Sequence, residues 1–224
     1  MARPLPKRRP IAVPWSPATD VRLPAGKRAV EVVLVLLLSP LWLPLLVTLM
    51  LIVRLDSPGP AVFRQRRYGR RGEVFTLLKL RSMVPGAEPA LTGHLAACPV
   101  RTAEWQTHAK LRADPRLTRI GRLLRRSSLD ELPQLINVLR GEMSLVGPRP
   151  IPLEERPRYG EAFAEYCKVR PGLTGLWQVS GRNDLPYDQR IDLDHRYIHH
   201  TSWRSECAIW CRTLVAVITR RGAY

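Results

Sequence analysis

The chain has 224 residues, 45% of them hydrophobic, which is enough for one globular core plus an anchor and too apolar for a disordered tail protein. Its 36 lysines and arginines outnumber 19 acidic residues, for a net charge of +17. That excess indicates an anionic partner, whether nucleic acid, an acidic membrane surface or a phosphorylated substrate. The four cysteines form no CxxC pair, which favours free thiols in a reducing compartment over a structural zinc site.

The N-terminal part divides into a basic segment and an apolar run. Residues 1–26 are rich in Pro, Arg and Lys without apolar periodicity, which predicts a flexible segment. Residues 29–53 are apolar except for Glu31, and this length can cross a hydrocarbon core of about 30 Å. The run starts too late and is too long for a signal peptide. We therefore predict a membrane segment over 27–54 and a catalytic domain over 55–224.

Charge and proline content predict how this segment lies in the membrane. Seven basic residues against one acidic residue precede it, and eight against two follow it up to Arg81, so each flank carries +6. The positive-inside rule places both flanks on the cytoplasmic side, which a single straight span cannot satisfy. Ser39-Pro40 and Pro44 interrupt helical hydrogen bonding mid-run, and the Ser39 hydroxyl can satisfy a freed carbonyl. We predict a re-entrant helix-break-helix, with a kinked span as the alternative.

A small β-hairpin should follow the membrane segment. Residues 61–64 and 74–80 have strand character, and residues 68–72 between them have turn chemistry. Leucine and isoleucine then recur at helical spacing among five arginines over 116–126. This pattern predicts either a helix on an anionic bilayer surface or a core-facing helix with a solvated basic back.

The rest of the sequence predicts further helices, so the expected fold of the chain is α+β and mostly helical. Helices are expected over 132–139, 191–198 and 207–218, and the last, which carries Trp210, suits a membrane interface. Prolines and glycines over 147–175 indicate loops around a site.

The run Ser127-Ser128-Leu129-Asp130-Glu131-Leu132-Pro133 has two interpretations. Ser128 and Glu131 have the spacing of a helix capping box, which this heptad alone favours. The preceding arginines and a helix N-terminus can instead hold phosphates beside the two carboxylates. Carboxylates among phosphates need a cation, usually Mg²⁺. Asp130 and Glu131 are thus candidates for a phosphoryl-transfer centre, one as nucleophile or metal ligand and the other as metal ligand or base.

Two further runs have polar groups in constrained backbone. The prolines of Gly147-Pro148-Arg149-Pro150 can hold the Arg149 guanidinium ready for phosphate, although a simple proline-rich turn is the alternative. The run from Arg170 to Arg182 combines loop glycines with Trp177, Gln178 and Arg182, which can stack on a base or bind a diphosphate. It matches neither a P-loop nor a dinucleotide-binding fingerprint.

Three histidines lie close together near the C-terminus. His195 and His199 are four residues apart, with His200 beside them, a spacing that permits a metal site on one helix face. Because no general-base glutamate lies between them, a solvated helix face is the favoured interpretation.

Taken together, these runs resemble the bacterial sugar transferase family of monotopic phosphoglycosyl transferases, from residue 27 to about 219. The matching runs are Ser39-Pro40, Asp56-Ser57-Pro58-Gly59-Pro60, Gln65-Arg66-Arg67-Tyr68-Gly69, Lys79-Leu80-Arg81-Ser82-Met83, Asp114-Pro115-Arg116, Thr118-Arg119-Ile120-Gly121, Ser128-Leu129-Asp130-Glu131-Leu132-Pro133-Gln134, Met143-Ser144-Leu145-Val146-Gly147-Pro148-Arg149-Pro150 and Arg170–Arg182.

The resemblance implies an enzyme of the bacterial inner membrane, with its catalytic domain on the cytoplasmic face. Asp130 matches the aspartate that attacks the β-phosphate of a UDP-sugar and releases UMP. A polyprenyl phosphate, such as undecaprenyl phosphate, then takes the sugar phosphate from this aspartyl intermediate. This is the first membrane step of exopolysaccharide or glycan assembly. Glu131 matches the partner carboxylate, and Mg²⁺ is the expected cofactor, held by both residues.

The resemblance also implies the surrounding site. Lys79, Arg125 and Arg149 match basic residues around the phosphates, and Asp194 matches a second acidic position. The implied partners are a UDP-sugar, polyprenyl phosphate and anionic membrane lipid, without nucleic acid. The glycine-rich form of the run ending at Arg182 resembles hexose-phosphate transferases, which favours glucose or galactose; the oligomeric state stays open.

Three departures from the family pattern affect these expectations. Leu80 replaces the usual phenylalanine, and Glu206 replaces a late aspartate, so Glu206 is left out of the site. No multi-pass region precedes the anchor, so we expect a short, single-anchor member. The alternative function is a non-enzymatic basic membrane protein that binds anionic lipid or nucleic acid, which leaves the acidic pair beside constrained arginines unexplained.

Overall fold

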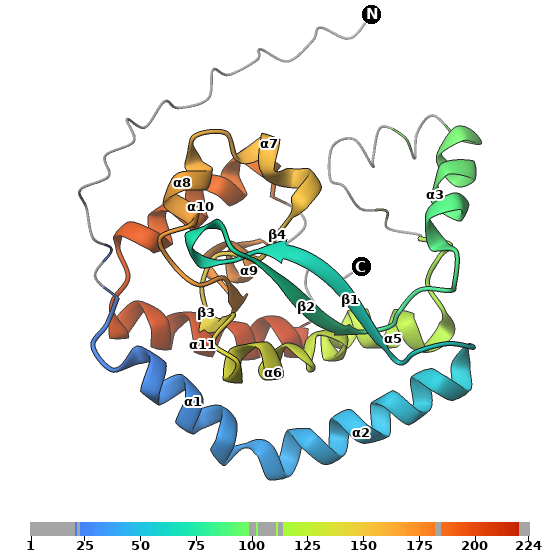
Figure 1. Ribbon diagram of the computed structural model, residues 1–224, viewed down its shortest axis with the longest axis horizontal. Helices are drawn as coiled ribbons and strands as arrows, with labels where there is room; N and C mark the ends of the chain where they lie inside the picture. The colour runs from blue at the N-terminus through green and yellow to red at the C-terminus, as the bar shows by residue number, and fades with distance from the viewer. Residues whose placement is uncertain are drawn as a thin grey trace, which may run out of the picture.

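The computed structural model describes residues 21, 23–98, 102, 111, 114–181 and 185–219, so most of the predicted segment 1–26 lies outside the described residues. Helices predominate over two small sheets (Figure 1). The elements are α1 (Lys27–Leu37), α2 (Ser39–Asp56), β1 (Val62–Tyr68), η1 (Arg70–Gly72), β2 (Val74–Leu80), α3 (Ala87–Ala96), α5 (Arg119–Ser127), η2 (Leu129–Glu131), α6 (Gln134–Leu139), β3 (Ser144–Val146), β4 (Ile151–Pro152), η3 (Leu153–Glu155), α7 (Arg156–Tyr159), α8 (Ala162–Tyr166), β5 (Gly172–Thr174), α9 (Leu176–Ser180), α10 (Tyr187–His199) and α11 (Trp203–Thr219).

Helices α1 and α2 form a V along one side of the molecule (Figure 1). The predicted helix break is present: α1 ends at Leu37 and α2 begins at Ser39. Pro40 lies in the first turn of α2, where its missing N–H costs nothing. The Ser39 hydroxyl donates to the Leu36 carbonyl at 2.7 Å, as expected for a carbonyl freed by the break.

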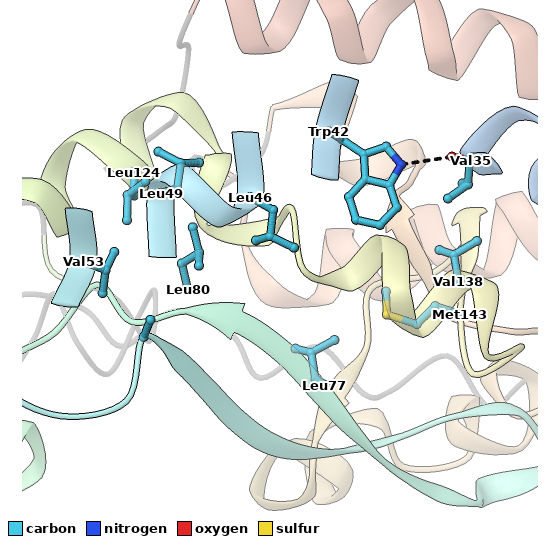
Figure 2. Close-up of a cluster of buried hydrophobic side chains, with 11 residues drawn as sticks. Val35, Trp42, Leu46, Leu49, Val53, Leu77, Leu80, Leu124, Val138 and Met143 are labelled. Carbon is cyan, nitrogen blue, oxygen red and sulfur yellow. Dashed lines mark hydrogen bonds between the residues drawn. The ribbon is translucent and has the colours of Figure 1, made fainter. Parts of the chain in front are cut away.

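One face of this helical hairpin belongs to the core of the domain. Figure 2 shows Trp42, Leu46, Leu49 and Val53 of α2 pointing at side chains of the globular part, among them Leu77. The Trp42 indole N–H donates to the Val35 carbonyl at 2.9 Å and so joins α2 to α1. Each such burial stabilises the fold by about 1.5–3 kcal/mol, so α2 is fixed to the domain along its length.

The opposite face of the helical hairpin is apolar and exposed. Its exposed side chains are Val30, Val33, Leu36, Leu37, Leu38, Leu41, Leu43, Leu45, Val47, Leu51, Ile52 and Leu55. Among the described residues, α2 is the one helix long and apolar enough to cross a membrane, and 22% of that stretch is buried. Its course through a bilayer stays a prediction.

The single charge in the apolar run is part of a buried ion cluster, here called the Lys27 cluster (Lys27, Glu31, Glu206 and Tyr197). The Lys27 ammonium lies 3.1 Å from Glu31 Oε1 and donates to Glu206 Oε2. Tyr197 donates to Glu206 Oε1 at 2.6 Å, and Glu31 Oε1 accepts from the Leu145 N–H at 3.0 Å. Helices α1, α10 and α11 are therefore joined through charges that are almost fully removed from water.

The predicted β-hairpin is confirmed, but the prediction ended its first strand too early. β1 runs to Tyr68 and pairs antiparallel with β2, from Val62 opposite Leu80 to Tyr68 opposite Val74. The clustered arginines hid the alternation: Arg66 is exposed, whereas Arg67 is buried at the position where the short strand β4 pairs with β1. Period-2 burial thus continues through residues that look uniformly polar.

One other prediction needs correction, and the structure decides between the two interpretations of the arginine-rich helix. Residues 147–175, predicted as loops, contain the short elements from β4 to β5, and β3 pairs parallel with β5. The predicted helices are present as α5, α6, α10 and α11. Leu124 of α5 is buried in the core against α2, which favours the core-facing interpretation, although Leu123 is exposed.

Candidate active site

The carboxylates Asp130 and Glu131 lie in η2, a single 3₁₀ turn between α5 and α6. Ser128 caps the C-terminus of α5 in the left-handed region, with φ 59°, and its side chain makes no capping hydrogen bond. The capping-box interpretation is therefore wrong, because the next α-helix begins only at Gln134. A non-glycine residue in this conformation costs of order 1–2 kcal/mol, and such strain concentrates at functional sites.

Lys79 of β2 lies between the two carboxylates; these three residues are here called the Lys79 cluster. Its ammonium donates to Glu131 Oε1 at 2.7 Å and lies 4.0 Å from Asp130 Oδ2. Asp130 is 7% exposed. Lys79 reaches this position because β2 alternates its side chains between the core, where Leu78 and Leu80 are buried, and the site.

Arginines from three segments surround the Lys79 cluster. Arg125 donates to Ser82 Oγ at 3.0 Å, and burial lowers its pKa, while the Asp130 carboxylate opposes this shift. Burial and then the neighbouring Arg149 lower the pKa of Arg67 to about 10. Guanidinium groups that are buried and repel one another form a preorganised site for an anion.

The five arginines expected to hold phosphates over 116–126 have different roles. Arg116 forms a buried, two-pronged ion pair with Asp114, at 2.8 and 2.6 Å. Arg125 faces inward, whereas Arg119, Arg122 and Arg126 are exposed. Among the five, Arg125 is thus the one placed beside the carboxylates, and Arg67 is an addition that sequence reasoning missed. The sequence signal for Arg67 was its position next to Arg66 in a strand, because successive side chains of a strand point to opposite faces of the sheet.

A narrow cleft, with a cavity volume of about 10 Å³, lies beside the Lys79 cluster. It is lined by Arg67, Leu77, Lys79, Glu131, Gln134, Arg149, Pro150, Gly172, Leu173 and Gln178. Three buried polar atoms of these residues, Arg67 Nε, Gln134 Nε2 and Gln178 Oε1, have no hydrogen-bond partner in the part of the chain that the structure describes. Since buried polar groups are almost always paired, this cleft is built for a polar ligand.

The loop that carries Arg149 is in close backbone contact with the glycine-rich run that begins at Arg170. A Cβ at Gly147 would lie 2.6 Å from the Arg170 carbonyl, so only glycine allows this approach. The Arg149 guanidinium then lies over the Trp177 ring, 5.7 Å from its centroid. Gln178 of the same run lines the cleft and donates to the Leu173 carbonyl at 3.1 Å.

Asp194 is a buried carboxyl group that interacts electrostatically with Arg149. It is 2% exposed and accepts a hydrogen bond from the Tyr159 hydroxyl at 3.1 Å. Burial raises the pKa of Asp194, and the positive charge of Arg149 acts against this shift. Asp194 is thus placed to act on Arg149 electrostatically. Arg182 lies outside the described residues.

The oxygen-only donor set of Asp130 and Glu131 fits a hard cation such as Mg²⁺. Glu131 lines the cleft, and Asp130, the preceding residue of the same tight turn, is buried next to it. Lys79 supplies a positive charge at the same point, so the acidic pair is already compensated before any ion binds.

This fold and site define a bacterial sugar transferase: the sequence model of that family matches residues 23–220, and the chain belongs to it. It is 44% identical over 198 residues to undecaprenyl-phosphate galactose phosphotransferase of Salmonella typhimurium, covering 88% of this chain and 41% of that one. It is 41% identical over 199 residues to exopolysaccharide production protein ExoY of Sinorhizobium fredii, covering 89% and 88%. It is 41% identical over 219 residues to UDP-glucose:undecaprenyl-phosphate glucose-1-phosphate transferase of Caulobacter vibrioides, covering 94% and 76%. The chain thus spans about two fifths of the Salmonella relative and most of the other two.

Proposed function

We propose that this protein transfers a hexose 1-phosphate from a UDP-hexose to polyprenyl phosphate and releases UMP. The observation that carries the proposal is the Lys79 cluster, of which Lys79 and Glu131 line a cleft and Asp130 lies 4.0 Å from Lys79. The other charged residues of this cleft, Arg67 and Arg149, are cationic. The diphosphate of a UDP-hexose supplies the negative charge that pairs with these two arginines. The names of the relatives support undecaprenyl phosphate as acceptor and glucose or galactose as the sugar.

The chemistry divides into two displacements at the β-phosphorus. Asp130 Oδ attacks, a bond forms between this oxygen and phosphorus, and the bond to the bridging oxygen breaks with its electron pair leaving on UMP. An oxygen of polyprenyl phosphate then attacks the same phosphorus, and the Asp130 carboxylate is regenerated. Arg67, Arg125 and Arg149 bind phosphate oxygens, and Lys79 orients the two carboxylates. When bound, Mg²⁺ supplies charge neutralisation between Asp130, Glu131 and the phosphates.

Gln178 suits a polar group of the donor, because its buried amide oxygen has no hydrogen-bond partner among the described residues. Trp177, expected to stack on a base, is 3% exposed with the Arg149 and Arg190 guanidinium groups over its ring, so it packs against Arg149 instead. We assign Gln178 to donor recognition, through hydrogen bonding.

We further propose that α1 and α2 enter the cytoplasmic leaflet and return, leaving both ends in the cytoplasm. Support comes from the two +6 flanks and from packing: the face of α2 from Trp42 to Val53 is held by the domain, so α2 cannot leave it to cross the bilayer alone. Exposed Leu123 of α5 and Leu214 of α11 add apolar groups at the surface. Cytoplasmic nucleotide sugars and anionic lipid are then accessible to one site.

Nucleotide release tests the catalytic proposal. Detergent-solubilised protein is incubated with UDP-glucose, UDP-galactose or UDP-N-acetylglucosamine, with polyprenyl phosphate and Mg²⁺, and UMP is measured. We expect release with a UDP-hexose and none with the Asp130→Asn variant. A protein that binds anionic vesicles but releases UMP from no donor supports the non-enzymatic alternative.

Cysteine labelling tests the topology. Single cysteines near positions 20 and 70, in a background with the four native cysteines replaced by serine, are exposed to an impermeant reagent in intact spheroplasts. We expect neither to react until the cells are opened. Reaction of either position from outside contradicts the re-entrant arrangement.

A further inference from the structure

We propose that Glu165, His195 and His199 form a binding site for a transition-metal ion of the Zn²⁺ class, separate from the Lys79 cluster. The sequence favoured a solvated helix face for these histidines, because no glutamate lies between them. The missing carboxylate comes instead from another helix: α8, which carries Glu165, packs beside α10, which carries both histidines (Figure 1).

The geometry brings one ligand atom from each residue to a common point. These three atoms all lie within 4.8 Å of one another, and Glu165 Oε2 is 2.9 Å from His199 Nε2. Ligands around a tetrahedral zinc, each at 2.0–2.2 Å, are roughly 3.3 Å apart, so small side-chain rotations complete the site. The histidine rings already lie together, with centroids 4.3 Å apart.

A buried carboxylate and an unpaired imidazole nitrogen distinguish this cluster from an ordinary surface group. Glu165 is 8% exposed, and its Oε2 lies 2.9 Å from His199 Nε2, a contact that is an ion pair only when the imidazole is protonated. Among the described residues, His195 Nε2 is buried without a hydrogen-bond partner. The carboxylate oxygen and the nitrogens of neutral imidazoles are electron-pair donors available to a cation.

The donor set selects the class of ion. Two imidazole nitrogens and one carboxylate oxygen suit Zn²⁺, or Co²⁺ as its spectroscopic substitute, and disfavour Mg²⁺, which prefers oxygen alone. Lys168 donates to Glu165 Oε1 at 2.6 Å, which orients the carboxylate and leaves Oε2 to the ion. The His199 side chain is 30% exposed, so an ion can enter from solvent and keep a water in the fourth position.

Such an ion would fix α10 against α8. Helix α10 carries Asp194 beside His195, and Tyr197 of the Lys27 cluster one turn further on, so its position affects both the cleft and the attachment of α1. We assign the site a stabilising role, which does not depend on the proposed transferase activity.

Metal binding to tag-free, full-length protein in detergent tests the site. Chelator-treated protein is titrated with Zn²⁺ by calorimetry in excess Mg²⁺, and with Co²⁺ while its visible absorption is recorded. We expect one ion per chain and, at about 100 times the Kd, a rise in Tm of roughly 5–10 °C. His199→Ala and Glu165→Gln should each weaken binding at least tenfold.

Two matched controls complete the design. His200→Ala removes a neighbouring exposed histidine, and Cys207→Ser with Cys211→Ser removes two exposed thiols four residues apart. Both should bind Zn²⁺ as the parent protein does. The proposal is overturned if the parent protein binds no more Zn²⁺ than His199→Ala, or if the thiol variant alone loses the ion. Since Glu165→Gln can affect folding, the decision rests on His199→Ala, whose side chain is partly exposed. UMP release is not measured, so failure here leaves the transferase proposal untouched.

Discussion

Two clusters in this protein have the same composition, a lysine between two carboxylates, and differ in their surroundings. In the Lys27 cluster, Lys27, Glu31 and Glu206 are 6%, 1% and 0% exposed and are joined by Tyr197 and backbone groups. In the Lys79 cluster, the Lys79 and Glu131 side chains are 19% and 23% exposed and border a cleft, whereas the Asp130 side chain is 9% exposed. Its neighbours are repelling arginines and polar atoms without hydrogen bonds.

This difference separates an attachment point from a reaction site. The Lys27 cluster is closed, because protein groups surround its charges, and its removal should affect folding. The Lys79 cluster is open on one side. The positive charge of the arginines around it is balanced only when an anionic ligand binds. The two clusters contain the same types of residue. Their roles differ because protein groups surround the charges of one cluster, whereas a cleft borders the other.

The largest effect should come from Asp130→Asn. The amide is a poor nucleophile and a poor metal ligand, so UMP release should fall about 1000-fold or more. Asp130 is 7% exposed, but the amide has the size of the carboxylate and removes a like charge beside Glu131, so Tm should change little. Loss of activity alone does not identify the nucleophile. Without lipid acceptor, the parent protein should release up to one equivalent of UMP and carry a sugar-phosphate mass on the peptide with Asp130. Glu131→Gln should slow this without moving the adduct. No UMP before polyprenyl phosphate is added, and no adduct, would indicate direct transfer.

Lys27→Met should have the next largest effect, on stability. Removing the cation leaves Glu31 and Glu206 buried without compensation, which costs about 3–5 kcal/mol. The matched variant Lys79→Met, in a half-open cluster, should lose little stability and most activity. Thermal unfolding and UMP release of both proteins test the comparison. Equal Tm losses in the two variants would remove the distinction between closed and open clusters.

Arg149→Lys should have a smaller effect, confined to activity. Lysine keeps the charge but loses the planar fork over Trp177 and the two-pronged binding of phosphate. We expect turnover to fall about 10- to 100-fold, with Tm nearly unchanged. Arg125→Lys should behave similarly. Unaltered turnover in the Arg149 variant would exclude that residue from the site.

The smallest effect should be a change in how stability depends on pH. Burial raises the pKa of Asp194 above its value of about 3.9 in the unfolded chain. The folded state therefore holds this proton over a pH range where the unfolded state does not, and the contribution of Asp194 to stability falls as pH rises from about 4 through the raised pKa. Asp194→Asn should flatten that decline, with Tm differences of about 2–4 °C between pH 5 and 8. Parallel curves for the two proteins would show that the carboxyl does not titrate differently on folding.

Local signals in the sequence were sufficient to predict several elements of the fold and the family of this protein. Alternating hydrophobicity and turn residues predicted the hairpin of β1 and β2, and Ser39-Pro40 predicted the break between α1 and α2. Ordered runs such as Gly147-Pro148-Arg149-Pro150 identified the family, which the comparison confirms. These features depend on residues near one another in the chain, so composition and spacing determine them.

Only the tertiary structure decided which distant groups meet. Arg67 is buried where the distant strand β4 pairs with β1, and Glu165 reaches His199 because α8 packs on α10. Glu206, unassigned in the sequence, meets Lys27 across 179 residues of chain, and Glu31 contacts the same lysine. The capping interpretation of Ser128 failed for a related reason: the turn after α5 is held by its surroundings in a conformation that local preference disfavours. Burial and charge pairing depend on packing between remote segments, and no local pattern encodes that packing.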